Sequence, residues 1–422
     1  MSSVSTHDQT RLDCARAHIQ VARDKALALL QPTKAQLEHG QELHRASIVV
    51  DSYGFTAHAI PACMQSVVEK AAAAGATHHE IQRLIHNLMV TGVVTDEDAR
   101  AEFNAAIDAS GVTCVVQNAG EGRNLQESLE RMSLFTHVCD ELPNVVKAVS
   151  ARQIEQAAKD RCHCLFLSLN NPIMDQRWDF WESELHWLSV FKQAGIRIMH
   201  LTYNRRNRCG DGCAEPANAG LSDFGRDVIG RMNELGLIVD VAHSGQRTSQ
   251  EAALASAKPI VASHSGVMAL NEHARNKTDD VIRAICDGGG YVGVCAIPPF
   301  LGRSRDIVAM LDHIQDLRDR FGADHVAIGC DATYLPDLPP RVSAIQKKLN
   351  PKRSFWSHWP PNDPLFEPGA EDDCRTGSLC WTNWPLFTVG LVQRGFSDED
   401  IRKVIGGNCL RVMRAVEDAR NE

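Results

Sequence analysis

The chain has 422 residues, of which 44% are hydrophobic and 23% charged, the proportions of an ordinary globular protein. The net charge of −9 argues against a nucleic-acid partner or an anionic membrane surface as the main target. The first residues lack the apolar core of a secretory signal, and no run reaches the roughly 20 apolar residues of a membrane span. We therefore expect a soluble, cytoplasmic protein whose fourteen cysteines are reduced thiols.

The chain starts with helical composition and continues with short apolar runs. Residues 8–45 have the pattern of one or two amphipathic helices, so we expect a helical N-terminal extension over residues 1–46. Eight apolar runs rich in β-branched residues follow, separated by helical segments, and each has the pattern of a buried parallel strand. The runs occupy residues 47–55, 112–119, 162–169, 195–203, 237–243, 259–264, 289–297 and 325–331.

Eight strands that alternate with helices predict an α/β fold, a (β/α)8 TIM barrel. A doubly wound open sheet is the alternative. However, no predicted strand is followed by a glycine-rich dinucleotide motif or by a phosphate-binding loop with its lysine. No internal repeat or low-complexity linker divides the chain, so we expect one barrel domain over residues 1–422.

One long segment, residues 332–384, interrupts the alternation after the eighth strand. It is rich in proline and aspartate, and it contains Trp356, Trp359, Trp381 and Trp384. A loop of this length in a compact domain is usually functional or disordered, and the aromatic residues favour order. Two interpretations stay open: a lid-like insertion or dimer contact over the barrel mouth, and a surface excursion anchored by hydrophobic side chains.

Two neighbouring strands each end in a histidine. His243 and His264 are 21 residues apart, with a helical segment between them. In parallel α/β folds ligands lie at the carboxyl ends of the strands, so both imidazoles should point into the same mouth. One such histidine alone would be best explained as a satisfied core residue. Two histidines on adjacent strands are better explained as a pair of metal ligands.

Other polar residues at strand ends complete the candidate site. Histidine nitrogens and a carboxylate are the usual ligands of a catalytic zinc with an open position for water, and His243, His264 and Asp331 meet this minimum. Asp331 could also take a proton and pass it to a leaving amine. Arg275 follows the sixth strand, where its guanidinium could hold a substrate carboxylate, although a surface salt bridge explains it as well.

Three long motifs carry a resemblance to a known family. GLSDFGRDVIGRMNELGLIVDVAHSG, PIVASHSGVMALNEHARN and HVAIGCD resemble the membrane dipeptidase (renal dipeptidase) family of zinc metallopeptidases, a branch of the amidohydrolase-like barrels. The similarity continues through GFSDEDIRKVIGGNCLRV, near the end of the chain. The resemblance implies a homodimeric (β/α)8 barrel with two zinc ions joined by a bridging carboxylate. It also implies cleavage of dipeptides that have a free C-terminal carboxylate.

Matched by position, the resemblance assigns roles to four residues. It implies that His243 and His264 are metal ligands of the fifth and sixth strands. It implies that Asp331 binds or faces the metal and shuttles the proton, and that Arg275 grips the substrate carboxylate.

The sequence also departs from the family pattern. Tyr53 and Phe55 occupy the positions of a metal-binding His-x-Asp pair, Asn170 that of the bridging glutamate, and Tyr203 that of a histidine that steadies the reaction intermediate. Phenylalanine cannot bind a cation, and a neutral amide is a poor bridge between two dications. We therefore expect that the ordinary binuclear site does not assemble.

Three hypotheses follow, in order of preference. In the first, one zinc ion on His243, His264 and Asp331 activates water, Tyr203 donates a hydrogen bond to the oxyanion, and Arg275, Tyr53 and Asn170 contact a small substrate. In the second, a metal-free site performs lyase or isomerase chemistry on a small carboxylate. In the third, the protein is a non-catalytic relative that binds a ligand.

Overall fold

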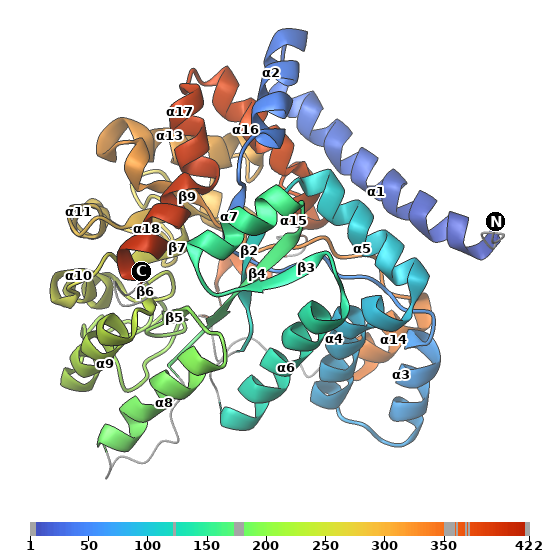
Figure 1. Ribbon diagram of the computed structural model, residues 1–422, viewed down its shortest axis with the longest axis horizontal. Helices are drawn as coiled ribbons and strands as arrows, with labels where there is room; N and C mark the ends of the chain where they lie inside the picture. The colour runs from blue at the N-terminus through green and yellow to red at the C-terminus, as the bar shows by residue number, and fades with distance from the viewer. Residues whose placement is uncertain are drawn as a thin grey trace.

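A ring of parallel strands lies at the centre of the molecule, with helices around it (Figure 1). The computed structural model describes residues 6–120, 124–172, 181–349, 359, 362–367, 369 and 372–417. Eight strands follow one hydrogen-bonded order, which confirms the predicted (β/α)8 fold. They are β1 (Val50–Gly54), β2 (Cys114–Asn118), β4 (His163–Leu169), β5 (Ile198–His200), β6 (Ile238–Asp240), β7 (Val261–Ser265), β8 (Tyr291–Val294) and β9 (Val326–Ile328).

Backbone hydrogen bonds just past the strand ends join the first strand to the last. The amide of Asp331 donates to the carbonyl of Tyr53 at 2.9 Å, and the amide of Phe55 donates to the carbonyl of Ala332 at 3.3 Å. These bonds lie at the carboxyl ends of β1 and β9. They therefore draw the first and last strands together at the barrel mouth.

A ninth strand, β3 (Val145–Ala148), was not expected from the sequence. It pairs in parallel with residues 163–166 of β4, whereas β5 pairs with Ser168 and Leu169 farther along the same strand. β2 also pairs with β4, over residues 164–168. β3 therefore lies off the eight-strand order and extends the sheet only beside the first half of β4.

The helices form an outer layer, and each connection between consecutive strands contains at least one helix. Their bounds are α1 (Thr6–Leu30), α2 (Lys34–Arg45), α3 (Met64–Ala73), α4 (His78–Thr95), α5 (Glu97–Ser110), α6 (Leu125–Glu141), α7 (Ala151–Asp160), α8 (Trp181–Gln193), α9 (Asp223–Leu235), α10 (Gln246–Ala255), α11 (Asp279–Asp287), α12 (Pro298–Leu301), α13 (Ile307–Phe321), α14 (Pro340–Leu349), α15 (Asp372–Thr376), α16 (Trp384–Gln393), α17 (Asp398–Arg402) and α18 (Asn408–Val416).

The N-terminal helices α1 and α2 pack against helices from the C-terminal half of the chain, and α1 also packs against α5. α2 contacts α16, and α1 contacts α5, α13 and α15. Apolar residues of α1, such as Ala15 and Ile19, belong to the same hydrophobic cluster as strand residues of the barrel. The division into one barrel domain with an extension over residues 1–46 stays a prediction.

The segment after β9 contains α14, α15 and two short 3-10 turns, η2 (Pro364–Phe366) and η3 (Trp381–Asn383). Trp381 and Trp384 are fully buried core residues. Trp359 packs near the rings of Phe300 and His273. Trp356 lies outside the described residues, and the role of residues 332–384 as a lid-like insertion stays a prediction.

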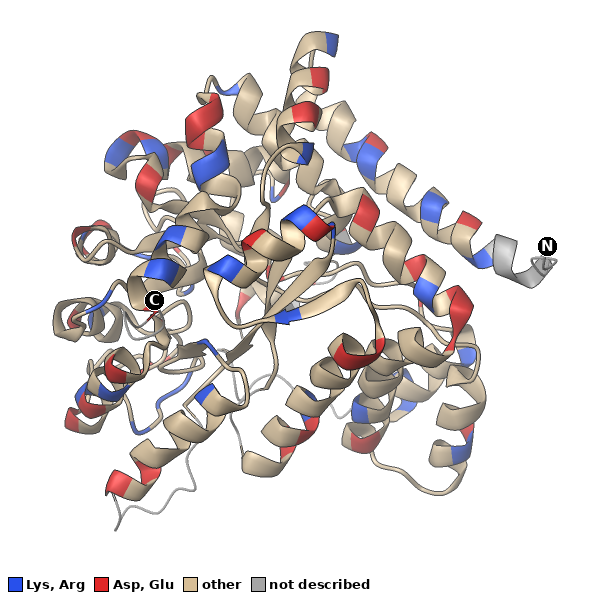
Figure 2. Cartoon of the chain, viewed as in Figure 1, with Lys and Arg blue, Asp and Glu red and all other residues tan. Residues whose placement is uncertain are grey.

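Charge and burial separate the layers. Acidic and basic residues occur mainly on the outer helices, and the central strands carry few of them (Figure 2). Every residue of β1, β2, β4 and β7 is buried, as expected for parallel strands covered by helices on one face and barrel side chains on the other. No helix within the described ranges is both long and apolar enough to cross a membrane.

Candidate metal centre at the barrel mouth

The carboxyl ends of five strands bring the candidate residues together. Tyr53 is on β1, Asn170 follows β4, His243 follows β6, His264 is on β7 and Asp331 follows β9. Apart from Asp331, all of these side chains are buried. The parallel strand order therefore converts positions up to 278 residues apart in sequence into one cluster, as the barrel topology predicts.

The two predicted histidines face each other directly. The Nε2 atoms of His243 and His264 are 2.9 Å apart. The ring of Tyr203 stacks on His243 with centroids 4.2 Å apart, and the ring of Tyr53 stacks on His264 at 3.9 Å. Each imidazole is thus held in place by an aromatic face, with its Nε2 directed at the other.

A hydrogen bond determines which ring nitrogen of His243 is protonated. Asn204 Oδ1 lies 2.6 Å from His243 Nδ1, and an amide oxygen can only accept, so Nδ1 carries the proton. His243 Nε2 therefore presents a lone pair toward His264. Ser263 Oγ lies 2.8 Å from His264 Nδ1 and orients the second ring in the same way.

Both histidines are held neutral. Burial, followed by the positive charge of Arg275, lowers the pKa of His243 and of His264 well below the ordinary value. A neutral imidazole with an exposed lone pair is the form that binds a transition metal. Neutral imidazoles at these positions therefore have the protonation state that metal binding requires.

A third histidine, His200 at the end of β5, completes a cluster that the sequence interpretation missed. One ligand atom from each of His200, His243 and His264 can be chosen so that all three lie within 4.8 Å of one another. In the described part of the chain, no other group of three or more metal-binding side chains meets this criterion. His200 Nε2 lies 2.9 Å from Asp240 Oδ2, and both side chains are fully buried.

Asp240 is ionised beside His200. Burial alone would raise its pKa, but the charge of His200 and hydrogen bonds from His200, Ser263 and the Ala242 amide together lower it. Both backbone amides, of Ala242 and Ser263, donate to Oδ1. Oδ2 is thereby left to face the imidazole.

Arg275 is fully buried, and its guanidinium lies against the histidine pair. Nη2 donates to the carbonyl of His264 at 2.9 Å and lies 3.3 Å from His243 Nε2, while Nη1 donates to the carbonyl of Ala242. The guanidinium also lies 5.4 Å from the ring centre of Phe300. The alternative of a surface salt bridge is therefore wrong, while the substrate-binding role stays a prediction.

The early strands present uncharged partners instead of metal ligands. Tyr53 Oη donates to Asn170 Oδ1 at 2.5 Å, which joins the ends of β1 and β4. Phe55 packs edge-on to Tyr53, with ring centroids 6.2 Å apart. The ends of β1 and β4 thus carry a neutral hydrogen-bonded pair, with an aromatic ring beside it.

Asp331 lies at the rim of the cluster rather than within it. Its Oδ2 is 3.9 Å from His264 Nε2, and its side chain keeps 23% of its surface exposed. Its backbone has a φ of 53°, in the left-handed region that aspartate tolerates better than most residues. The preceding amide, of Cys330, is held by Asp51 Oδ1 at 2.9 Å, which helps to fix this turn.

The two residues that sequence reasoning missed, His200 and Asp240, did carry a signal. Both are polar residues inside otherwise apolar strand segments, in IMHL and LIVDVA. A buried strand seldom contains a charged or titratable side chain unless that side chain has a partner. Two such residues on adjacent strands could have been paired with each other.

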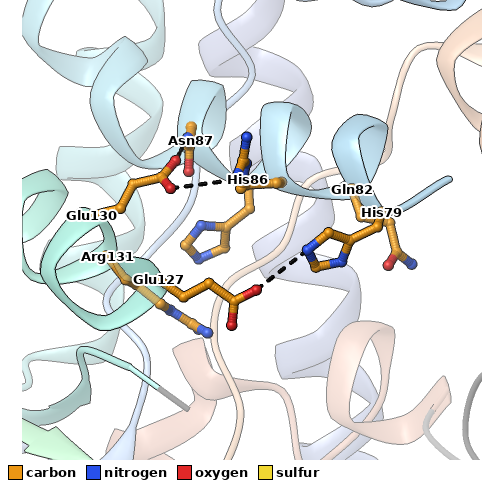
Figure 3. Close-up of a pocket in the computed structure, with 8 residues that line it drawn as sticks. His79, Gln82, His86, Asn87, Glu127, Glu130 and Arg131 are labelled. Atoms are coloured by element: carbon orange, nitrogen blue, oxygen red, sulfur yellow. Dashed lines mark hydrogen bonds and ion pairs between the residues drawn. The ribbon is translucent and has the colours of Figure 1, made fainter. Parts of the chain in front are cut away.

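A second hollow lies between α4 and α6, away from the histidine cluster (Figure 3). Its charged groups are paired across the two helices: His79 Nε2 lies 3.4 Å from Glu127, Arg83 lies 3.4 Å from Glu130, and Asn87 donates to Glu130 at 3.3 Å. The barrel mouth, where neutral ligand atoms converge, is the stronger candidate for chemistry.

Comparison with known proteins agrees with this geometry. Residues 37–341 and 380–422 match the membrane dipeptidase family (Peptidase family M19). Dipeptidase tcpJ of Claviceps purpurea (strain 20.1) is 28% identical over 236 residues, which are 55% of this chain and 47% of that protein. The chain thus spans about half the length of the curated relatives it matches.

Two solved structures share the fold over most of the chain. An amidohydrolase from Pseudomonas aeruginosa is 26% identical, with a TM-score of 0.63 and coverage of 89% of this chain and 98% of that one. The probable dipeptidase PvdM from Pseudomonas aeruginosa also has a TM-score of 0.63, at 18% identity, covering 91% of this chain and 99% of that one.

Proposed function

The chain belongs to the membrane dipeptidase family, and from this premise we propose that it is a metal-dependent hydrolase. We propose that it cleaves a dipeptide, or a related small amide with a free carboxylate. The observation that carries the proposal is the pair of His243 and His264, buried and neutral, with Nε2 atoms 2.9 Å apart at the ends of adjacent strands.

The donor atoms fit a zinc ion. Two nitrogens bound to one tetrahedral zinc at about 2.0–2.1 Å each are roughly 3.3 Å apart, close to the separation of the two Nε2 atoms. Facing lone pairs at that distance repel unless a proton or a cation lies between them. We propose one ion per chain on His243 and His264, with Asp331 as the third candidate ligand.

A single ion is favoured because the second subsite lacks ligands. The neutral Tyr53–Asn170 pair and Phe55 occupy the positions where the family pattern has ligands of the other zinc. A neutral amide and an aromatic ring cannot balance the charge of another dication.

We assign proton transfer, oxyanion stabilisation and substrate binding to three residues near the ion. A bound zinc supplies Lewis acidity, which makes water a better nucleophile and polarises the scissile carbonyl. Asp331, exposed to the mouth, accepts the proton from water and delivers it to the leaving amine. Tyr203 donates a hydrogen bond to the developing oxyanion, and Arg275 holds the substrate carboxylate.

The substrate class rests on the relatives and on Arg275. Several relatives carry the name dipeptidase, which makes a dipeptide the first substrate to test. An amide or lactam of a small amino acid has the same chemistry, a carbonyl flanked by nitrogen with a carboxylate nearby. Tyr53 and Asn170 would contact this substrate from the early strands.

A metal-free function is the alternative, and one contact favours it. Arg275 Nη2 already lies 3.3 Å from His243 Nε2, so a cationic group is close to the lone pair that the metal would use. In that case the histidines, tyrosines and Asp331 would perform acid–base lyase or isomerase chemistry on a small carboxylate, or the site would only bind a ligand.

Metal analysis of protein purified without chelator separates these functions. We expect about one zinc per chain and hydrolysis of members of a dipeptide library, followed by release of free amino acids. Protein without metal that nevertheless converts a carboxylate would support the lyase alternative. Protein without turnover that a small carboxylate stabilises against heat would support the binding alternative.

Two further properties are proposals of the same kind. Family resemblance leads us to propose a homodimer, which light scattering of the purified chain tests directly. The fourteen cysteines, all present as free thiols, support a cytoplasmic location, where thiols stay reduced.

A further inference from the structure

His200 is the one histidine of the barrel cluster that has no role in the proposed function. Resting on that function, we propose that His200 rather than Asp331 is the third protein ligand of the metal, and that Asp240 is the carboxylate that orients it. The site would then hold one ion by three histidines from the consecutive strands β5, β6 and β7.

The first support is the position of the ring. His200 is fully buried, and its ring centroid lies 5.2 Å from that of His243, 5.4 Å from that of His264 and 5.1 Å from that of Tyr53. All three contacts are edge-to-face. The centroids of His243 and His264 are 4.9 Å apart, so the three imidazoles form a nearly equilateral triangle, with ligand atoms of all three within 4.8 Å.

The second support is an unsatisfied nitrogen. Nε2 of His200 has only the 2.9 Å ion-pair contact with Asp240 Oδ2, and neither ring nitrogen has a hydrogen-bond partner of good geometry in the described part of the chain. A buried polar atom without a partner is costly, commonly by about 1–3 kcal/mol. A metal ion would remove that cost, because it uses the lone pair that nothing else in the site uses.

The third support is the carboxylate behind the ring. Histidine ligands almost always give their second nitrogen to a carboxylate or carbonyl, which fixes the tautomer and strengthens the ligand. Asp240 is fully buried and uses Oδ1 for two backbone amides, which leaves Oδ2 for His200. A fully buried carboxylate 2.9 Å from this imidazole has a clear purpose if the imidazole binds a cation.

Asp331 fits a different task. Its Oδ2 stays 3.9 Å from His264 Nε2, and the side chain reaches the solvent at the mouth. A three-histidine set leaves an open position for water, as catalytic zinc sites do. It also leaves Asp331 uncoordinated and able to exchange protons.

The test measures metal affinity, and its variants keep the fold. Asp240→Asn retains Oδ1 for both amides, and His200→Phe in that background replaces the imidazole by a ring of similar shape without leaving a buried charge unpaired. We expect Asp240→Asn to weaken Zn²⁺ or Co²⁺ binding by about 10–100-fold, as outer-shell changes do. The double variant should lose more than about a further 10-fold, and Asp331→Asn should lose less than about 10-fold.

The outcomes separate this inference from the proposed function. If the unmodified protein binds no metal by calorimetry, both fail. If it binds one ion and the double variant binds as tightly as Asp240→Asn, or if Asp331→Asn abolishes binding, only the role of His200 is overturned. Pulsed electron paramagnetic resonance of the Cu²⁺-loaded unmodified protein gives a check without substitutions: three bound imidazoles are expected, and two would overturn the inference.

Discussion

The two sides of the barrel mouth are built on the same scaffold but have opposite electrostatics. On the late side, β5–β7, three buried imidazoles lie around Asp240, whose pKa is lowered despite its burial. On the early side, β1 and β4, Tyr53 and Asn170 form a neutral pair, and the buried Asp51 has its pKa raised to about 7, mainly by burial.

The difference shows that two sides of one barrel mouth can carry different charges on the same scaffold. Ligand positions on different strands are independent, because each strand end contributes its own side chain to the mouth. One half can therefore lose its charged ligands if the replacements satisfy each other, as Tyr53 Oη and Asn170 Oδ1 do. The other half brings ligand atoms of three histidines within 4.8 Å of one another.

The largest expected effect comes from breaking the late side. We expect His243→Ala to lower metal content from about one ion to near zero and turnover by more than about 100-fold, because a direct ligand should matter more than an outer-shell partner. Tyr53→Phe is the matched change on the early side. It should keep the metal and cost about 1–2 kcal/mol of unfolding free energy, because Asn170 loses a hydrogen-bond donor. Elemental analysis measures the metal content of both variants, and urea unfolding measures their stability. Metal loss in Tyr53→Phe would contradict the assignment of metal binding to the late side alone.

A smaller, constructive effect is expected from rebuilding the early side. The combination Tyr53→His, Phe55→Asp and Asn170→Glu restores the family's ligand types. Without metal, buried and unpaired charges should destabilise the variant by several kcal/mol, on the order of 3–5. With excess zinc we expect a second bound ion and a recovery of thermal stability. A variant that still binds a single ion would show that the backbone, and not only the side chains, differs from the binuclear form.

The pH dependence of stability sharpens the contrast between the two aspartates. The folded pKa of Asp51 is raised from 3.8 to about 7, so its contribution to stability is fully present below pH 3.8 and is lost as the pH rises toward 7. We expect Asp51→Asn to remove a slope of up to about 1.4 kcal/mol per pH unit in this window.

Asp240 should behave in the opposite way. Its folded pKa is lowered, so its contribution is present at neutral pH and is lost as the pH falls through that lowered value. Urea unfolding from pH 2 to pH 8 of the unmodified protein, Asp51→Asn and Asp240→Asn measures both slopes, because the slope of Asp240 lies below its ordinary pKa of 3.8. Equal slopes in all three proteins would remove the electrostatic distinction between the two sides.

Much of the fold could be predicted from the chain alone. Each of the eight apolar runs overlaps a strand of the eight-strand order, and the helical extension at residues 8–45 corresponds to α1 and α2. These features are local, because hydrophobic periodicity and turn residues set them without reference to the rest of the molecule. β3 was missed because its four residues, VVKA, form too short and too mixed a run to stand out.

The candidate site could be predicted only in part. The closeness of His243 and His264 followed from adjacent strands that end at the same mouth, and the structure places their Nε2 atoms 2.9 Å apart. The inclusion of His200 could not be read from the motif. Its importance depends on the packing of its ring between two others and on the carboxylate of Asp240 behind it.

The sequence by itself determined the alternation of strands and helices, the family and the residue types available at each strand end, because all of these depend on local pattern. Only the tertiary structure decided which side chains meet. It made Tyr53 and Asn170 partners, turned the Arg275 guanidinium inward and brought a third imidazole to the histidine pair. The physical reason is that hydrogen bonds and ligand geometry act over a few ångströms, and the closure of the barrel sets those distances.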